Sequence, residues 1–113
     1  MAETQRLPRA DNRLKLILDE AARLFREKGY AATSMRDIAA AAGMLPGSLY
    51  YHFTAKEDLL VAVYEEGVRR ITEKVQAAVA RHDKPWERLE AAAVAHLEAL
   101  LKTGDYALVV IRV

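Results

Sequence analysis

The sequence predicts an all-α protein, and three observations lead to this fold class. Ala and Leu are the commonest residues, whereas the 113 residues include only five Gly and three Pro, a composition that favours helices over sheets. Apolar residues recur at intervals of three and four along most of the chain, which is the spacing of one face of a helix. Residues 33–56 contain two short helical patterns separated by Gly43, an arrangement typical of a helix-turn-helix unit.

The first predicted helix runs through the apolar positions before Gly29. We expect it to begin near Asp11 or Asn12, because either side chain can cap a helix N-terminus. Gly29 ends the helix, since glycine adopts the left-handed conformation of a C-cap without strain. The apolar positions between these ends are Leu14, Ile17, Leu18, Ala21, Leu24 and Phe25.

Two short helices follow. Ser34 and Asp37 match a capping box, so the second helix is predicted to open at Thr33 or Ser34 and to stop at Gly43. The third is predicted to run from Pro46 to Phe53, because proline is well tolerated in a first helical turn. Leu49 and Phe53, four residues apart, would anchor it to the core.

Two longer helices complete the prediction. Thr54 and Glu57 match a second capping box, opening a helix of about 27 residues, or roughly 40 Å. After a break at residues 82–85 a fifth helix runs to Gly104, with Trp86 expected to be a packing anchor. Its predicted apolar face comprises Trp86, Leu89, Ala93, Leu97, Leu100 and Leu101. The chain then stops inside the apolar run 106–113, so we expect it to be the front part of a longer protein, or this end to be covered by a partner.

Bulk composition excludes several classes of protein. There is no cysteine and hence no disulfide framework, which fits a reducing cytoplasm, and no apolar run is long enough to span a membrane. Net charge is only +1, but it is unevenly distributed. Residues 1–56 hold nine Lys and Arg against six Asp and Glu, whereas residues 57–113 hold eight against ten. The front half is therefore the half that would tolerate a polyanion.

The third helix carries the candidate functional residues. Its first turn, with Pro46, Gly47 and Ser48, is expected to face outward. Tyr50, Tyr51 and His52 cannot all be buried on so short a helix, and such side chains can donate to phosphates or touch a thymine methyl group. The alternative is that one tyrosine belongs to the core and the other side chains are solvated surface. This alternative applies most strongly to Tyr50.

These residues resemble the TetR family of bacterial transcriptional repressors over positions 12–65 or so. The shared pattern is Thr33, Ile38, Ala39, Ala42, Gly43, Gly47, Leu49, Tyr50, His52, Phe53, Lys56 and Leu59. The resemblance implies a three-helix, homeodomain-like DNA-binding domain and a larger helical domain for a small-molecule effector and homodimerisation. It divides the chain into a flexible basic arm (1–10), a DNA-binding domain (11–56) and the start of a truncated regulatory domain (57–113).

The resemblance also implies residue roles in binding a double-stranded, palindromic operator. Thr33 and Arg36 would contact backbone phosphate, and Pro46, Ser48 and Tyr51 would face the base edges. Tyr50, His52 and Lys56 would clamp phosphates on either side. Gly47, in the first turn of the third helix, would also belong to the DNA-binding surface. For Lys56 the alternative is a solvated surface lysine. Arg6, Arg9, Arg13 and Lys15 would reach phosphate or the minor groove, or else form a solubilising tail.

One departure from the family pattern concerns Leu45, where a Ser or Thr cap is usual. The missing cap oxygen costs about 0.5–2 kcal/mol and leaves the Gly47 and Ser48 N–H groups without that acceptor. We hypothesise that a DNA phosphate satisfies at least one of them.

The fifth helix carries the one candidate for an effector contact. His96 lies near its apolar face, where it is either a polar group inside an effector pocket or a core-edge histidine. The expected effector is a small molecule, such as an acyl-CoA or another lipid-like ligand. No cofactor or metal is expected, because the three histidines stand far apart in the sequence.

Competing functions come from two other classes. A helical protein-interaction module that keeps the helix-turn-helix shape would bind with little salt dependence, whereas DNA binding weakens steeply with salt. An α-helical enzyme is disfavoured, because the sequence has no Gly-rich phosphate loop and no nucleophile elbow. The sequence therefore predicts a cytoplasmic, ligand-responsive DNA-binding regulator, associated with the bacterial nucleoid when bound to DNA.

Overall fold

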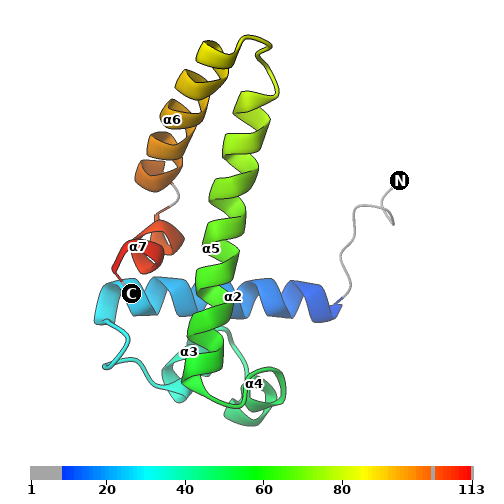
Figure 1. The fold of residues 1–113 in the computed structure, drawn as a ribbon. Coiled ribbons are helices and arrows are strands. Elements are labelled where there is room, and N and C mark those ends of the chain that lie inside the picture. The colour runs from blue at the N-terminus through cyan, green and yellow to red at the C-terminus, as the bar shows by residue number, and fades with distance from the viewer. Residues whose placement is uncertain (1–8, 103, 113) are drawn as a thin grey trace. The chain divides into compact units, whose positions relative to one another are not determined.

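The structure is all-α, as predicted (Figure 1). The computed structural model describes the backbone of residues 9–102 and 104–112 and the side chains of residues 12–102 and 104–109. Its helices are α2 (Arg9–Lys28), α3 (Met35–Ala41), α4 (Pro46–His52), α5 (Lys56–Val79), α6 (Pro85–Lys102) and α7 (Asp105–Arg112). The chain forms two compact units that divide between Ala62 and Val63, inside α5. The functional division expected between residues 56 and 57 falls at the first turn of α5.

Helix α2 begins earlier than its sequence pattern indicated. It starts at Arg9, so Asp11 and Asn12 lie in its first turn and the prediction that one of them is the cap is wrong. Acidic and polar side chains are well tolerated in a first turn, where they complement the helix dipole. The predicted arm, residues 1–10, falls mostly outside the described residues. At the other end Gly29 has φ +89° and its N–H donates to the Phe25 carbonyl at 3.0 Å, as expected of a C-cap.

Helix α3 has the predicted capping interactions at both of its ends. The Ser34 hydroxyl accepts from the Asp37 N–H, and an Asp37 carboxylate oxygen accepts from the Ser34 N–H, both at 3.0 Å. At the other end Gly43 has φ +70°, its N–H donates to Ala40, and the Met44 N–H donates to the Ala39 carbonyl. This is the Schellman arrangement, and it turns the chain sharply into α4.

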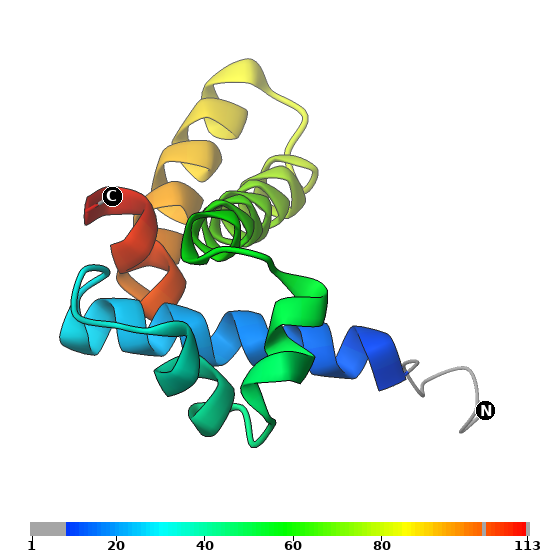
Figure 2. The same ribbon diagram turned by 90° about the horizontal axis from the view of Figure 1, so that it is seen from below.

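The core of the first unit lies where α2, α3 and α4 meet (Figure 2). Helix α3 packs against both α2 and α4. Burial of each large aliphatic side chain there contributes about 1.5–3 kcal/mol. The side chains buried in this unit include Ile17, Phe25, Ile38, Ala39, Leu49 and Leu59.

The start of α5 differs from the predicted capping box. The helix begins at Lys56, and the Thr54 hydroxyl donates to an Asp58 carboxylate oxygen at 2.9 Å. The prediction that Thr54 and Glu57 form a capping box is therefore wrong. A hydrogen bond to a charged carboxylate is stronger than one to a neutral amide, which favours the observed arrangement.

In the second unit α6 runs back beside the second half of α5, and α7 packs on α6 (Figure 1). Most of the apolar run that the sequence analysis assigned to no helix thus lies in α7, where Tyr106, Ala107 and Val109 are buried. The Arg70 guanidinium of α5 lies 4.1 Å from the centroid of the Tyr106 ring and donates to Glu66 at 2.7 Å. This cation–π contact ties α5 to α7.

The predicted apolar face of α6 is largely exposed. Trp86 is 75 % exposed and Leu101 is 81 % exposed, whereas Ala99 is buried. The prediction that Trp86 is a packing anchor is therefore wrong for the described residues. Its ring lies in the first turn of α6, at the connection to α5, where it is left uncovered.

Candidate nucleic-acid interface

Helix α4 is held in place by a single buried residue. Leu49 is fully buried, and the Phe53 N–H donates to its carbonyl at 2.9 Å, closing the helix at Phe53. The remaining positions of α4 are at least partly accessible. The short helix therefore presents most of its surface away from the core, as predicted.

The aromatic side chains of α4 lie at the surface. Tyr51 is 87 % exposed and Tyr50 is 47 % exposed, while His52 is half-buried. The Tyr51 and His52 rings meet edge to face, with centroids 5.5 Å apart. Two aromatic groups with hydrogen-bonding atoms therefore lie together on α4, and such groups are able to contact bases or phosphates.

The first turn of α4 carries an accessible backbone donor. Leu45 occupies the N-cap position with φ −74° and ψ 149° and provides no side-chain acceptor. The Ser48 N–H donates to the Leu45 carbonyl at 3.0 Å, so the hypothesis that this group awaits a phosphate does not hold. The Gly47 N–H has no acceptor among the described residues, and Gly47 is exposed. Pro46 and Ser48 are half-buried beside it.

Helix α3 contributes one cation and one residue that does not fit its predicted role. Arg36 is exposed in the first turn of α3, at the end that follows the α2–α3 connection. Thr33, by contrast, is 1 % exposed, and its hydroxyl lies 2.8 Å from the Gly29 carbonyl and 3.3 Å from that of Leu24. Its side chain therefore braces the α2–α3 connection and is not presented to a phosphate.

Lys56 is held by a residue that the sequence analysis did not single out. Its ammonium group donates to the Tyr30 carbonyl at 2.7 Å and lies 4.2 Å from the centroid of the Tyr30 ring. Lys56 is thus half-buried and is not a freely solvated lysine. Burial, with a smaller contribution from the Glu57 carboxylate, raises the pKa of Tyr30. The two residues are 26 positions apart, so no local pattern could have revealed the contact.

Several charged side chains near this surface are paired with one another. Lys28 of α2 lies 2.9 Å from the Asp37 carboxylate of α3. The Ser34 N–H, then Lys28 and the Ser34 hydroxyl, lower the pKa of Asp37 to about 2. Of the predicted basic arm, Arg6 and the Arg9 side chain lie outside the described residues, Arg13 is exposed, and Lys15 pairs with Asp19 at 3.0 Å.

The second unit contains open grooves between α5 and α6. One has a volume of about 510 Å³ and is mostly apolar. His96, which is exposed, is one of the residues that line it. The other lining residues are Val68, Ile71, Thr72, Val75, Gln76 and Leu100.

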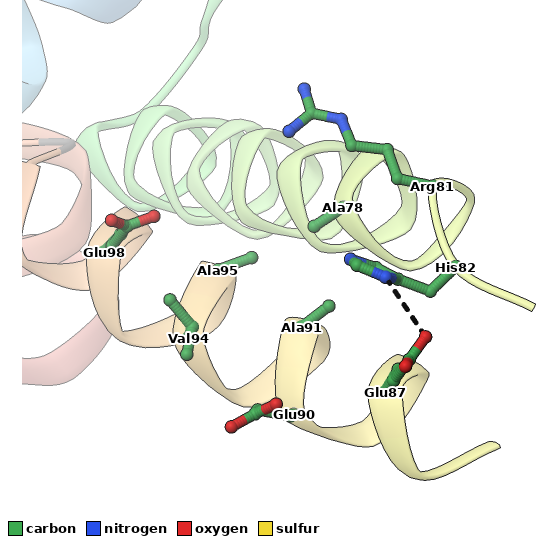
Figure 3. A pocket seen from close by; sticks show the side chains of 9 residues that line it. All are labelled: Ala78, Arg81, His82, Glu87, Glu90, Ala91, Val94, Ala95 and Glu98. Carbon is green, nitrogen blue, oxygen red and sulfur yellow. Dashed lines mark ion pairs between the residues drawn. The ribbon is translucent and has the colours of Figure 1, made fainter. Parts of the chain in front are cut away.

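Another groove, of about 530 Å³, lies near the α5–α6 connection and has a mixed polar lining (Figure 3). His82 and Glu87 face each other there at 3.8 Å. Within the described residues no cluster of three or more His, Cys, Asp or Glu side chains is arranged to hold a metal ion. Nor does this part of the chain contain a helix long and apolar enough to cross a bilayer.

Comparison with known proteins agrees with this geometry. Residues 17–63 match the model of the bacterial regulatory proteins of the tetR family. Over this segment the chain belongs to the TetR family. The matched segment runs from the middle of α2 into α5 and contains the predicted DNA contacts of α3, α4 and Lys56, but not those of the basic arm.

Individual TetR-family proteins are similar to this chain over about half of their own length. The HTH-type transcriptional repressor KstR2 of Mycobacterium tuberculosis is 37 % identical over 84 residues, which are 74 % of this chain and 42 % of that protein. The structure of that ketosteroid transcriptional regulator is similar with a TM-score of 0.73 and 33 % identity, over 88 % of this chain and 50 % of that one. The fatty acid metabolism regulator protein of Bacillus subtilis is 27 % identical over 95 residues, 84 % of this chain and 48 % of that protein. These relatives are regulators and not enzymes.

Proposed function

We propose that the chain contains the DNA-reading head of a TetR-type transcriptional repressor, and that the exposed aromatic surface of α4 docks in the major groove of an operator. The observation that carries the proposal is Tyr51, 87 % exposed on a helix that is itself anchored by the fully buried Leu49. A large amphipathic ring on so rigid a support loses little conformational entropy when it binds. The TetR-family relative KstR2 is named as a transcriptional repressor, which supports the same conclusion.

The contacts proposed for the DNA divide by chemistry. Ser48 and Tyr51, with Pro46 beside them, face the base edges and read sequence. Arg36, Tyr50 and His52 lie on phosphates, together with Lys56 and the Gly47 N–H. Such contacts position the protein without reading sequence. Thr33 is omitted, because its hydroxyl is already committed to two backbone carbonyls.

Binding to DNA is tested by selecting duplexes from a random library and measuring Kd against salt concentration. We expect a log–log slope of about −0.9 for each phosphate contacted. Tyr51→Ala and Arg36→Ala should weaken binding, whereas Trp86→Ala, which removes another largely exposed ring, from α6, should not. A flat salt dependence would instead support the competing protein-interaction module.

We further propose that the mostly apolar groove between α5 and α6 is part of an effector site for a lipid-like small molecule, such as an acyl-CoA. Its volume of about 510 Å³ lies within the range of small-molecule sites, about 300–1,000 Å³. Thr72, Gln76 and His96 supply hydrogen-bonding groups along an otherwise apolar lining. The relatives named as ketosteroid and fatty acid metabolism regulators support a ligand of this kind.

Titration with a long-chain acyl-CoA and with a ketosteroid tests the effector site. Either ligand should shift the His96 ring signals in the NMR spectrum, and His96→Leu should weaken its binding. By linkage, an effector that weakens DNA binding is itself bound more weakly, to the same extent, when DNA is present.

The full-length protein is proposed to act as a cytoplasmic homodimer on a palindromic operator, with successive major grooves about 34–36 Å apart.

A further inference from the structure

Lys56 is the one proposed DNA contact whose charged group is already bound within the protein. Its ammonium nitrogen lies 2.7 Å from the Tyr30 carbonyl oxygen and 4.2 Å from the centroid of the Tyr30 ring. The two contacts approach the ammonium group from different parts of the same residue. Together they restrict a side chain that otherwise has large rotamer freedom.

Tyr30 is in turn fixed by the core of the first unit. Its ring packs on Phe25, which is buried, with centroids 5.3 Å apart. Its carbonyl also accepts from the Thr33 N–H at 3.2 Å. The position of the Lys56 ammonium is therefore set by the α2–α3 connection and not by α5 alone.

The location of Lys56 makes this support necessary. As the first residue of α5, it places a positive charge beside the positive end of the helix dipole, which by itself is unfavourable. The carbonyl oxygen and the electron-rich face of the ring offset that repulsion. An ammonium group has three N–H donors, and the Tyr30 carbonyl takes one of them.

We propose that Tyr30 is a positioning residue for DNA binding, which holds the Lys56 ammonium group in place for a backbone phosphate. The inference rests on the proposed function, because it presupposes that Lys56 contacts DNA. A preorganised cation does not have to be ordered when the complex forms, so binding is tighter than it would be with a mobile lysine.

The test is a double-mutant cycle on binding to a short DNA duplex of arbitrary sequence, over about 50 to 200 mM salt. Tyr30→Leu removes the ring but keeps apolar volume against Phe25, and Tyr30→Phe is the matched control that keeps the ring. Lys56→Gln removes the charge. Thermal unfolding of each variant establishes that it is folded at the temperature of the binding measurement.

We expect Tyr30→Leu to weaken duplex binding about two- to fivefold, and Tyr30→Phe to bind like the parent. Lys56→Gln should make the log–log salt slope shallower by about 0.9. In the Lys56→Gln background Tyr30→Leu should have no further effect on binding, because Tyr30 acts through Lys56.

Three results would overturn the inference. If Tyr30→Leu and Lys56→Gln each lower the unfolding temperature yet leave duplex binding unchanged, the contact is purely structural. Tighter binding by Tyr30→Leu would mean that Tyr30 holds Lys56 away from DNA, and additive effects in the double mutant would mean that the residues act separately. A parent protein without salt-dependent duplex binding would instead refute the proposed function itself.

Discussion

Leu45 leaves the first turn of α4 without a side-chain cap, and this gives a test of stability separate from binding. Leu45→Ser should stabilise the free protein by about 0.5–2 kcal/mol, because a serine oxygen can accept from the Gly47 N–H, which has no acceptor among the described residues. Denaturant unfolding measures this change. DNA affinity should not rise, and much tighter binding by the variant would refute the view that the uncapped turn is reserved for phosphate.

Thr33 supports the α2–α3 connection from inside the core. Thr33→Val keeps the shape but removes the hydroxyl that donates to the Gly29 and Leu24 carbonyls. We expect a loss of about 1–3 kcal/mol in the free energy of unfolding, because buried acceptors lose their donor. Thr33→Ser, which keeps the hydroxyl, is the matched control. DNA binding by the folded Thr33→Val protein should be unchanged, and a selective loss of binding would restore Thr33 as a phosphate contact.

Asp37 makes the stability of the first unit depend on pH in the acidic range. Its pKa in the folded protein is lowered from 3.8 to about 2, so its contribution to stability is fully present above pH 3.8 and is lost as the pH falls towards 2. Asp37→Asn should remove this part of the acid dependence. Unfolding measured at several pH values checks it, and an identical pH profile for parent and variant would contradict the assigned cause.

Among the elements, the turn between α3 and α4 sets the geometry of the helix-turn-helix. Gly43 has φ +70°, and a Cβ added there would meet nothing within 4 Å, so Gly43→Ala should cost only the backbone strain, about 1–2 kcal/mol. Gly47 is equally open but lies in the first turn of α4 without a positive φ, so Gly47→Ala should stabilise the fold, by up to about 1 kcal/mol. Thermal unfolding of the pair compares these signs. Equal effects of the two substitutions would argue against the Schellman geometry.

Local sequence signals predicted the elements well wherever the deciding contacts are local. The Ser34–Asp37 capping box, Gly43 and Pro46 fixed the ends of α3 and the start of α4, because each acts within four residues. The Thr54 prediction was wrong, because a hydroxyl that matches a capping pattern can also donate to a nearby carboxylate.

Contacts between distant segments escaped prediction. Nothing in the sequence pairs Tyr30 with Lys56, or Arg70 with Tyr106, because these contacts depend on how helices pack. The exposure of Trp86 escaped prediction for the same reason, since helical spacing identifies an apolar face but not what covers it. Thr33 illustrates a different limit of prediction. Its position in the family pattern implied a phosphate contact, whereas its hydroxyl bonds backbone carbonyls within the protein.

At the scale of the whole molecule, the two proposed tasks belong to different parts of the chain. The first unit exposes Arg36 on α3 and Gly47 and Tyr51 on α4, and the second contains an apolar groove that His96 lines. Helix α5 contributes residues to both units, and we propose it as the element that couples the proposed effector site to DNA binding. Such coupling requires the ligand to discriminate between two states of that helix.

The central claim is that α4 and the start of α3 form the surface that meets DNA. Titration of the ¹⁵N-labelled protein with a short duplex, followed by amide chemical shifts, tests this claim most directly. We predict the largest changes at Arg36, Gly47 and Tyr51, and unchanged signals along the exposed face of α6 around Trp86 and Leu101. Changes confined to α6, or none at all with a duplex that the library selection enriches, would contradict it.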